Sequence, residues 1–135
     1  MKTKLLSAAA LALFALPAFA GDAAKGESEF KKCKACHAII APDGTAVQTG
    51  GKTGPNLYGV IGRPVASVEG FGYGESILAV GATGKVWDEA MLAEYVKNPT
   101  EWLKETLGDS SAKSKMSFKL AKGGEDVAAY LASVK

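Results

Sequence analysis

Between residues 38 and 86 the chain is rich in Gly, Pro, Thr and Ser and shows no sustained hydrophobic period of 2 or 3.6. A stretch of this length without regular elements is evidence against a chain that builds its core from its own side chains alone. Such a stretch becomes reasonable if another group supplies part of the core. The 135-residue chain fits one domain.

A candidate attachment point is the run Cys33-Lys34-Ala35-Cys36-His37, which uses both cysteines and the single histidine of the chain. A C-x-x-C-H motif is typical of c-type haem attachment. Two thiols three positions apart in a helical turn can reach both vinyl groups of one porphyrin, and the adjacent histidine then lies under the iron. The motif predicts one haem c, bound covalently through Cys33 and Cys36, with His37 as an iron ligand.

Other uses of these residues stay open at this point. An exported chain meets an oxidising compartment, in which the two cysteines could form a structural disulfide. A thioredoxin-like dithiol is expected after a strand in a βαβ pattern, and no such pattern is visible here. A structural zinc site takes four N or S ligands, whereas the motif offers three. The histidine after the second cysteine and the loop-rich middle favour haem.

The start of the chain has the three parts of a secretory signal peptide. A basic beginning is followed by an apolar run without charge at 5–16 and by the small-x-small site Ala18-Phe19-Ala20. The apolar run is too short to span a bilayer, and an uncleaved membrane anchor is the alternative. The sequence predicts a cleaved signal peptide at 1–20 and one domain at 21–135. We expect a soluble periplasmic protein with no permanent membrane anchor.

Cleavage would change the charge balance. The whole chain has 16 basic and 14 acidic side chains, and removal of Lys2 and Lys4 would leave 14 of each. The basic residues are unevenly placed, since lysines surround the cysteines and recur in the loop at 110–122. No aromatic-and-basic pattern suggests nucleic-acid binding.

Short helical segments flank the irregular middle of the chain. Residues 23–32 are predicted to form a helix that runs into the cysteines. Asp88 is a plausible N-cap of a second helix, and the Asn-Pro pair at 98–99 ends that helix and starts another, which Gly108 stops. A last helix follows the glycine pair at 123–124. The expected fold is all-α, with three or four short helices, long loops and no clear strand.

A second axial ligand is expected from methionine, because the motif already uses the only histidine. Met1 leaves with the signal peptide, so Met91 and Met116 are the candidates. Met91 stands at helical spacing between Trp87 and Tyr95, which makes core packing its expected role. Met116 lies in a loop without apolar periodicity, and a loop can bring a thioether to the iron. A Met116 that only packs against the haem would leave the iron five-coordinate.

Further motifs follow one another across residues 21–135. They are the run from Thr53 to Gly59 with Gly62-Arg63, then Phe71-Gly72-Tyr73, Trp87, the segments 95–99 and 115–118, and Tyr130-Leu131. Together with the C-x-x-C-H motif, this order resembles the class I cytochromes c, most closely the cytochromes c2 of purple photosynthetic bacteria. The gaps from His37 to Pro55 and from Trp102 to Met116 are longer than in the mitochondrial proteins and resemble the large bacterial c2 type.

The resemblance implies a class I cytochrome c fold, in which three to five short helices and long loops wrap around one covalently bound haem. It implies Met116 as the second iron ligand. It also implies that the Pro55 carbonyl accepts the other N–H of the iron-bound His37 imidazole, as metal-binding histidines usually require. By composition alone, the segment around Pro55 would be only a turn.

The same resemblance implies roles for four further side chains. Arg63, Tyr73 and Trp87 match donors to the haem propionates, which are anionic and partly buried and therefore need partners. Without the resemblance, Arg63 would be a solvated charge and Trp87 a core residue. Tyr95 matches a tyrosine whose hydroxyl faces the methionine sulfur, and ordinary helix packing is its other interpretation.

Two strong axial ligands leave no open position for a substrate, so we expect an electron carrier and not an enzyme. By resemblance, the cytochrome bc1 complex donates the electron, and a photosynthetic reaction centre or terminal oxidase accepts it. The carrier is expected to be a monomer. A ring of lysines at the exposed haem edge would steer an acidic partner at low salt. The expected docking residues are Lys32, Lys34, Lys52, Lys113, Lys115 and Lys119.

Two other function classes remain open from the sequence. One is a ligand-binding or peroxidase-like haem protein with Met116 off the iron, although no distal histidine exists to help that chemistry. The other is a structural or assembly protein in which the C-x-x-C pair forms a disulfide.

Overall fold

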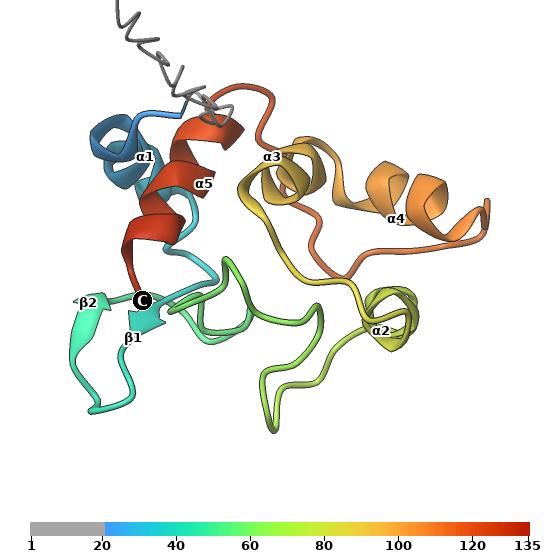
Figure 1. Cartoon of the computed structure of the whole chain (residues 1–135), viewed down its shortest axis with the longest axis horizontal. Helices are drawn as coiled ribbons and strands as arrows, with labels where there is room; N and C mark the ends of the chain where they lie inside the picture. Colours follow the sequence, from blue (N-terminus) through green and yellow to red (C-terminus); the bar gives the residue numbers. More distant parts are fainter. Residues whose placement is uncertain (1–20) are drawn as a thin grey trace, which may run out of the picture.

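The computed structural model describes residues 21–135, so the expected signal peptide at 1–20 lies outside the described residues. Long loops join five α-helices within the described range (Figure 1). The helices are α1 (Ala23–Glu29), α2 (Glu75–Ala82), α3 (Glu89–Lys97), α4 (Pro99–Leu107) and α5 (Gly124–Ser133), and a 3-10 turn η1 (Phe30–Lys32) extends α1. None of the helices between residues 21 and 135 has the length and apolar character needed to cross a bilayer.

The crossing of α1 and α5 joins the two ends of the domain (Figure 1). Phe30 is fully buried there, and its ring lies 5.9 Å from the Tyr130 ring. A Cβ on Gly26 would overlap the Asp126 carbonyl oxygen and lie 2.8 Å from the Tyr130 Cβ. The two backbones can therefore approach this closely only because residue 26 has no side chain.

The expected helix ends in the second half of the chain are confirmed. The Asp88 carboxylate accepts the Met91 N–H at 2.7 Å and caps α3. The Asn98 side chain caps α4 by accepting the Glu101 N–H, with Pro99 in the first turn. Gly108 ends α4 with a φ of 62°, in the left-handed region that favours glycine.

The irregular middle contains two strands and a helix that the sequence analysis did not predict. The strands β1 (Ile39–Ile40) and β2 (Ala46–Gln48) form a small antiparallel hairpin, in which Ile39 pairs with Gln48. The expectation of no strand is therefore wrong, because strands of two and three residues are too short to show a period. Helix α2 escaped prediction because its Gly74 N-cap makes no side-chain hydrogen bond and its sequence lacks a clear polar face.

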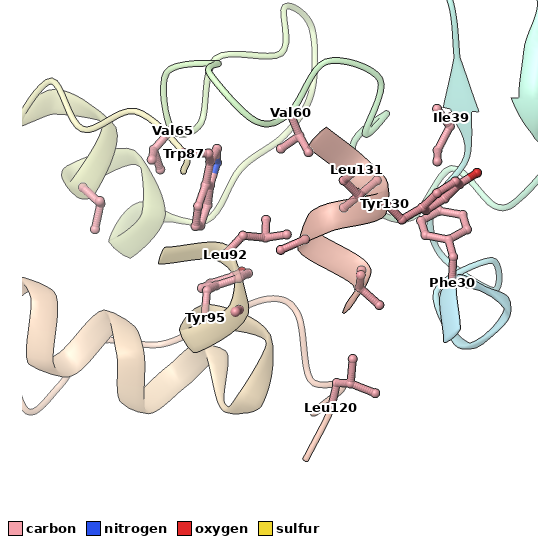
Figure 2. Close-up of a cluster of buried hydrophobic side chains, with 14 of the residues drawn as sticks. Phe30, Ile39, Val60, Val65, Trp87, Leu92, Tyr95, Leu120, Tyr130 and Leu131 are labelled. Carbon is pink, nitrogen blue, oxygen red and sulfur yellow. The ribbon is translucent and has the colours of Figure 1, made fainter. Parts of the chain in front are cut away.

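The hydrophobic core takes side chains from the helices and from the loops (Figure 2). Leu131 of α5 and Leu92 of α3 contribute from helices, whereas Val60 and Val65 come from the irregular middle. The loop segment thus packs against the helices at separate points along its length. Part of the loop between β2 and α2 lies beside the motif with the two cysteines and is hydrogen-bonded to it.

We expect Gly26→Ala to lower the free energy of unfolding by about 2 kcal/mol, because overpacking against the α5 backbone outweighs a gain of about 1 kcal/mol in helix propensity. Denaturant unfolding of the haem-containing protein measures the change. Gly72→Ala is the matched control, since a Cβ there meets nothing within 4 Å. Equal unfolding midpoints for the two variants would contradict the close crossing.

Candidate haem-attachment site

The two cysteines and the histidine of the motif stand on one helical turn. The chain leaves η1 at Cys33, whose N–H donates to the Phe30 carbonyl at 2.8 Å. The Cys33 carbonyl accepts the N–H groups of Cys36 at 3.2 Å and His37 at 2.9 Å. Both cysteines are free thiols in the structure, Cys33 partly buried and Cys36 exposed. One short segment thus presents two sulfur atoms and an imidazole, as attachment to a single porphyrin requires.

Burial raises the pKa of the Cys33 thiol to about 11, and the nearby Glu29 carboxylate adds to the rise. The thiol of the haem-free chain therefore stays protonated at neutral pH. The neighbouring Lys32 ammonium opposes this shift, but burial dominates.

The His37 imidazole is oriented by a backbone carbonyl. Its Nδ1 lies 2.8 Å from the Pro55 oxygen, across eighteen positions of the chain. Because a carbonyl oxygen can only accept, Nδ1 carries the proton and Nε2 keeps its lone pair. Burial lowers the pKa of His37, and the bond to Pro55 raises it by less. The ring is therefore neutral at neutral pH and has one nitrogen available to a metal.

The segment that carries Pro55 runs alongside the motif and is bonded to it repeatedly. Three of its N–H groups donate to carbonyls of the motif segment: Gly51 to Lys34 at 2.9 Å, Gly54 to Cys36 at 2.7 Å, and Leu57 to Ala38 at 3.1 Å. The His37–Pro55 bond lies within this series. The residues that orient the imidazole are therefore fixed to the backbone of the motif on both sides of the bond.

Glycines make this close approach possible. A Cβ on Gly50 would overlap the His37 carbonyl oxygen, and one on Gly51 would overlap the Ala35 carbonyl oxygen. A Cβ on Gly54 would lie 2.6 Å from His37 Nδ1. The sequence analysis assigned these glycines no role. Their clustering before Pro55 was the available signal, but only the fold shows which backbone atoms they admit.

Backbone pairing brings two of the expected propionate donors together. The Trp87 N–H donates to the Arg63 carbonyl at 3.0 Å, and the Gly62 N–H donates to the Trp87 carbonyl at 2.7 Å. Trp87 is buried and Arg63 partly buried. Burial lowers the pKa of Arg63, whereas the nearby Tyr73 hydroxyl raises it.

These side chains also have partners within the chain. Arg63 Nη1 donates to the carbonyls of Asn56 at 3.0 Å and Tyr58 at 3.1 Å. The Tyr73 hydroxyl accepts the Val68 N–H at 2.9 Å. A guanidinium has five N–H donors, so Arg63 keeps further donors for an anionic group while Nη1 binds the backbone.

Tyr95 belongs to an aromatic cluster with Trp87 and Trp102. The Tyr95 ring lies 5.1 Å from Trp87 and 5.3 Å from Trp102, and the two indoles stack at 5.5 Å. Burial raises the pKa of the Tyr95 hydroxyl, and a hydrogen bond with the Ser114 side chain lowers it. Tyr95 thus packs within the helices and also contacts the loop that carries Met116.

The loop around Met116 is held at both ends and in the middle. Before Met116, the Lys113 N–H donates to the Ser76 hydroxyl at 3.0 Å, which ties the loop to α2. After it, the Leu120 N–H donates to the Val96 carbonyl at 2.7 Å, at the end of α3. Met116 itself is partly buried against the core. Met91, the other candidate, packs against the same core from α3.

The expected docking lysines differ in their surroundings. Lys32 pairs with Glu29 at 2.6 Å, and Lys115 Nζ donates to the Gly72 carbonyl at 3.1 Å. Four others make no salt bridge within residues 21–135, namely Lys34, Lys52, Lys113 and Lys119. Lys115 therefore also stabilises the Met116 loop, a role that the sequence analysis did not assign to it.

The residues fit a covalently attached haem. Two thiols and a neutral imidazole share one turn, and the imidazole keeps Nε2 available. Gly54 leaves room beside the imidazole where any side chain would displace it. This chemistry, with a second segment fixed by hydrogen bonds to hold the ring, is what an axial histidine of a c-type haem requires.

No family model matches the chain. Cytochrome c2 of Rhodobacter capsulatus is 62% identical over 135 residues, covering 99% of this chain and 98% of that protein. Cytochrome c-550 of Paracoccus versutus is 59% identical over 136 residues, covering 98% and 88%. The solved structure of the Rhodobacter capsulatus cytochrome c2 has a TM-score of 0.83 at 64% identity, covering 84% of this chain and 97% of that chain.

The chain therefore belongs to the class I c-type cytochromes and is close to the cytochromes c2. It has the class I cytochrome c fold, as expected. It carries one covalently attached haem c, with Cys33 and Cys36 spaced for the attachment. Its function is electron transfer. This function replaces the alternative of a structural protein in which the two cysteines form a disulfide.

We expect Gly54→Ala to displace the His37 ring from Pro55, because a Cβ cannot fit 2.6 Å from Nδ1. The visible absorption bands of the haem should shift, and the unfolding midpoint should fall. Gly72→Ala again serves as control and should leave the spectrum unchanged. A Gly54→Ala protein with unaltered bands would show that the imidazole does not need this space.

Proposed function

We propose that the chain is a soluble periplasmic carrier of one electron, with His37 and Met116 as the axial ligands of its haem. The observation that carries this proposal is the His37–Pro55 bond of 2.8 Å. This bond leaves Nε2 unprotonated and fixes the ring through Nδ1, as is usual for a metal-binding imidazole. Met116 is the proposed second ligand because it lies in a loop that is anchored to α2 and to Ser114, whereas Met91 belongs to helix α3.

The bound haem supplies a reversible one-electron change at its iron, and the chain supplies everything around it. The Pro55 carbonyl keeps the proton on Nδ1 and so makes the imidazole a stronger donor. As an iron ligand, the Met116 thioether would favour the ferrous state and raise the reduction potential. Trp87 and Arg63 are paired through the backbone, and the N–H and O–H groups of Arg63, Trp87 and Tyr73 would hold the propionates.

Binding of the iron by both His37 and Met116 would leave no site for a substrate, so the proposed role is that of a carrier and not of an enzyme. The buried Tyr95 limits solvent access beside the Met116 loop. The Ser114 hydroxyl, which lies near Tyr95, accepts the Met116 N–H at 3.0 Å. In this proposal Tyr95 stabilises the ligand loop through Ser114 and directs its hydroxyl toward the methionine sulfur.

We propose that the mature protein is a periplasmic monomer of residues 21–135, formed after removal of the signal peptide at 1–20. Its electron donor is the membrane cytochrome bc1 complex. Its acceptor is a photosynthetic reaction centre or a terminal oxidase. All of these partners are membrane complexes, so the carrier has to diffuse between them and dock through its own surface charge.

Docking is proposed to rest on the lysines around the cysteines and the Met116 loop. Lys34, Lys52, Lys113 and Lys119 are the members without a salt bridge in the described residues. Lys32 and Lys115 have intramolecular partners, and we expect them to contribute less to steering than the other four. Long-range attraction between a lysine ring and an acidic partner speeds encounter and is screened by salt.

Visible and near-infrared spectra test the ligand set. We expect a sharp low-spin spectrum in the reduced protein and the weak far-red ferric band of sulfur–iron ligation. Met116→Leu should abolish that band and lower the potential by a sizeable part of the roughly 0.8 V range that axial ligands span. Met91→Leu conserves the side-chain volume equally well and should retain both the far-red band and the wild-type reduction potential.

A far-red band that survives in Met116→Leu would exclude Met116 as the ligand. A high-spin wild-type ferric spectrum, with bands that move on addition of carbon monoxide after reduction, would instead indicate an open iron and a ligand-binding protein.

Charge reversal tests the docking surface. We expect Lys34→Glu to slow reduction by the isolated bc1 complex at low ionic strength and to have little effect at high ionic strength, because salt screens the interaction. Lys85→Glu is the control, since Lys85 is exposed and lies outside the proposed docking set. The measurement is the second-order rate constant over a salt series, and identical salt slopes for the two variants would disprove steering through Lys34.

A further inference from the structure

The side chain of Asn56 makes three hydrogen bonds, two of them to a single residue of β1. Its Oδ1 accepts the Ile40 N–H at 2.9 Å, and its Nδ2 donates to the Ile40 carbonyl at 2.8 Å. Oδ1 also accepts the Tyr58 N–H at 3.1 Å. The amide thus pairs with the backbone of Ile40 as a neighbouring strand would, although Asn56 is not part of the sheet.

The backbone of Asn56 is held as well. Its carbonyl accepts Arg63 Nη1 at 3.0 Å. On the other side of the Pro55–Asn56 peptide, the Gly54 N–H is bonded to the Cys36 carbonyl at 2.7 Å. Because the peptide bond is planar, the direction of the Pro55 C=O follows from the positions of the residues on its two sides. Fixing Asn56 therefore aims the Pro55 carbonyl.

We propose that Asn56 is a positioning residue for the haem, which sets the His37–Pro55 hydrogen bond by anchoring the Pro55 peptide to β1. It contacts neither the imidazole nor the iron, and it acts through the Pro55 carbonyl. A strong bond from Nδ1–H makes the imidazole a better donor and so favours the ferric state. Loosening the anchor should weaken that bond and raise the reduction potential. This inference rests on the proposed ligation by His37.

A purely structural role, in which Asn56 only holds the hairpin, predicts a different outcome. The chain offers a matched control in Gln48, another amide, located in β2 of the same hairpin. Gln48 Nε2 donates to the Tyr130 hydroxyl at 3.0 Å and ties the hairpin to α5. Gln48→Ala therefore removes a side-chain anchor of the hairpin without a direct connection to Pro55.

The experiment compares Asn56→Ala and Gln48→Ala in the haem-containing protein. The readouts are the reduction potential and the hydrogen exchange of the His37 Nδ1 proton, followed by NMR in the ferrous protein. We expect Asn56→Ala to speed that exchange by about tenfold, the effect of one lost hydrogen bond of ordinary strength. The reduction potential should rise by at most about 59 mV, which for one electron corresponds to a tenfold change in the ferrous-to-ferric ratio. Gln48→Ala should leave both unchanged.

Asn56→Asp covers the case in which Asn56→Ala does not fold, because it keeps both acceptor bonds and loses only the donation to Ile40. It should speed the Nδ1 exchange by less than Asn56→Ala would. Wild-type exchange and potential in a folded Asn56→Ala protein, or wild-type exchange in Asn56→Asp, would overturn the inference and leave the electron-carrier proposal intact. A wild-type protein without low-spin spectra would overturn the proposed ligation itself.

Discussion

The bond from His37 Nδ1 to the Pro55 carbonyl joins two segments that are far apart in the sequence, and the rest of the site is arranged around it. It determines which nitrogen of the imidazole carries the proton and therefore which one can bind iron. Backbone bonds from Gly51, Gly54 and Leu57 to the motif surround it. The glycines allow this approach, since a side chain at 54 would occupy the space of the ring itself. The second segment of chain thus holds the imidazole of the short motif in one orientation, with Nε2 available to iron.

Met116, the proposed second ligand, is held in a different way. The Met116 loop has no regular structure, and single hydrogen bonds attach it to α2, to the end of α3 and, through Lys115, to the Gly72 carbonyl. Such a loop depends on several weak anchors, whereas His37 depends on a continuous series of backbone bonds. The two axial positions of the proposed site therefore differ in rigidity. The segment that carries His37 has more backbone hydrogen bonds than the Met116 loop. The Met116 loop is therefore the part of the proposed site that is expected to open first under destabilising conditions.

Much of the domain consists of loop, and its stability depends on a few close contacts. The crossing of α1 and α5 requires Gly26, and it brings Phe30 and Tyr130 together in the core. The aromatic group of Trp87, Tyr95 and Trp102 joins α3 and α4 to the segment that carries Arg63. These clusters place the expected propionate donors and the Met116 loop around the same core. The loops are thereby held in position without regular secondary structure of their own.

The sequence by itself determined the chemistry and the helix ends. The C-x-x-C-H motif specifies haem attachment, and Asp88, the Asn-Pro pair at 98–99 and Gly108 specify where helices begin and stop, because capping depends on local residues alone. Only the tertiary structure decided the features that short sequence patterns do not encode. The hairpin of β1 and β2 is too short to show a period, and α2 has no capping side chain. The contacts of Gly54, Asn56 and Lys115 are with residues distant in the chain, and they exist only once the chain has folded.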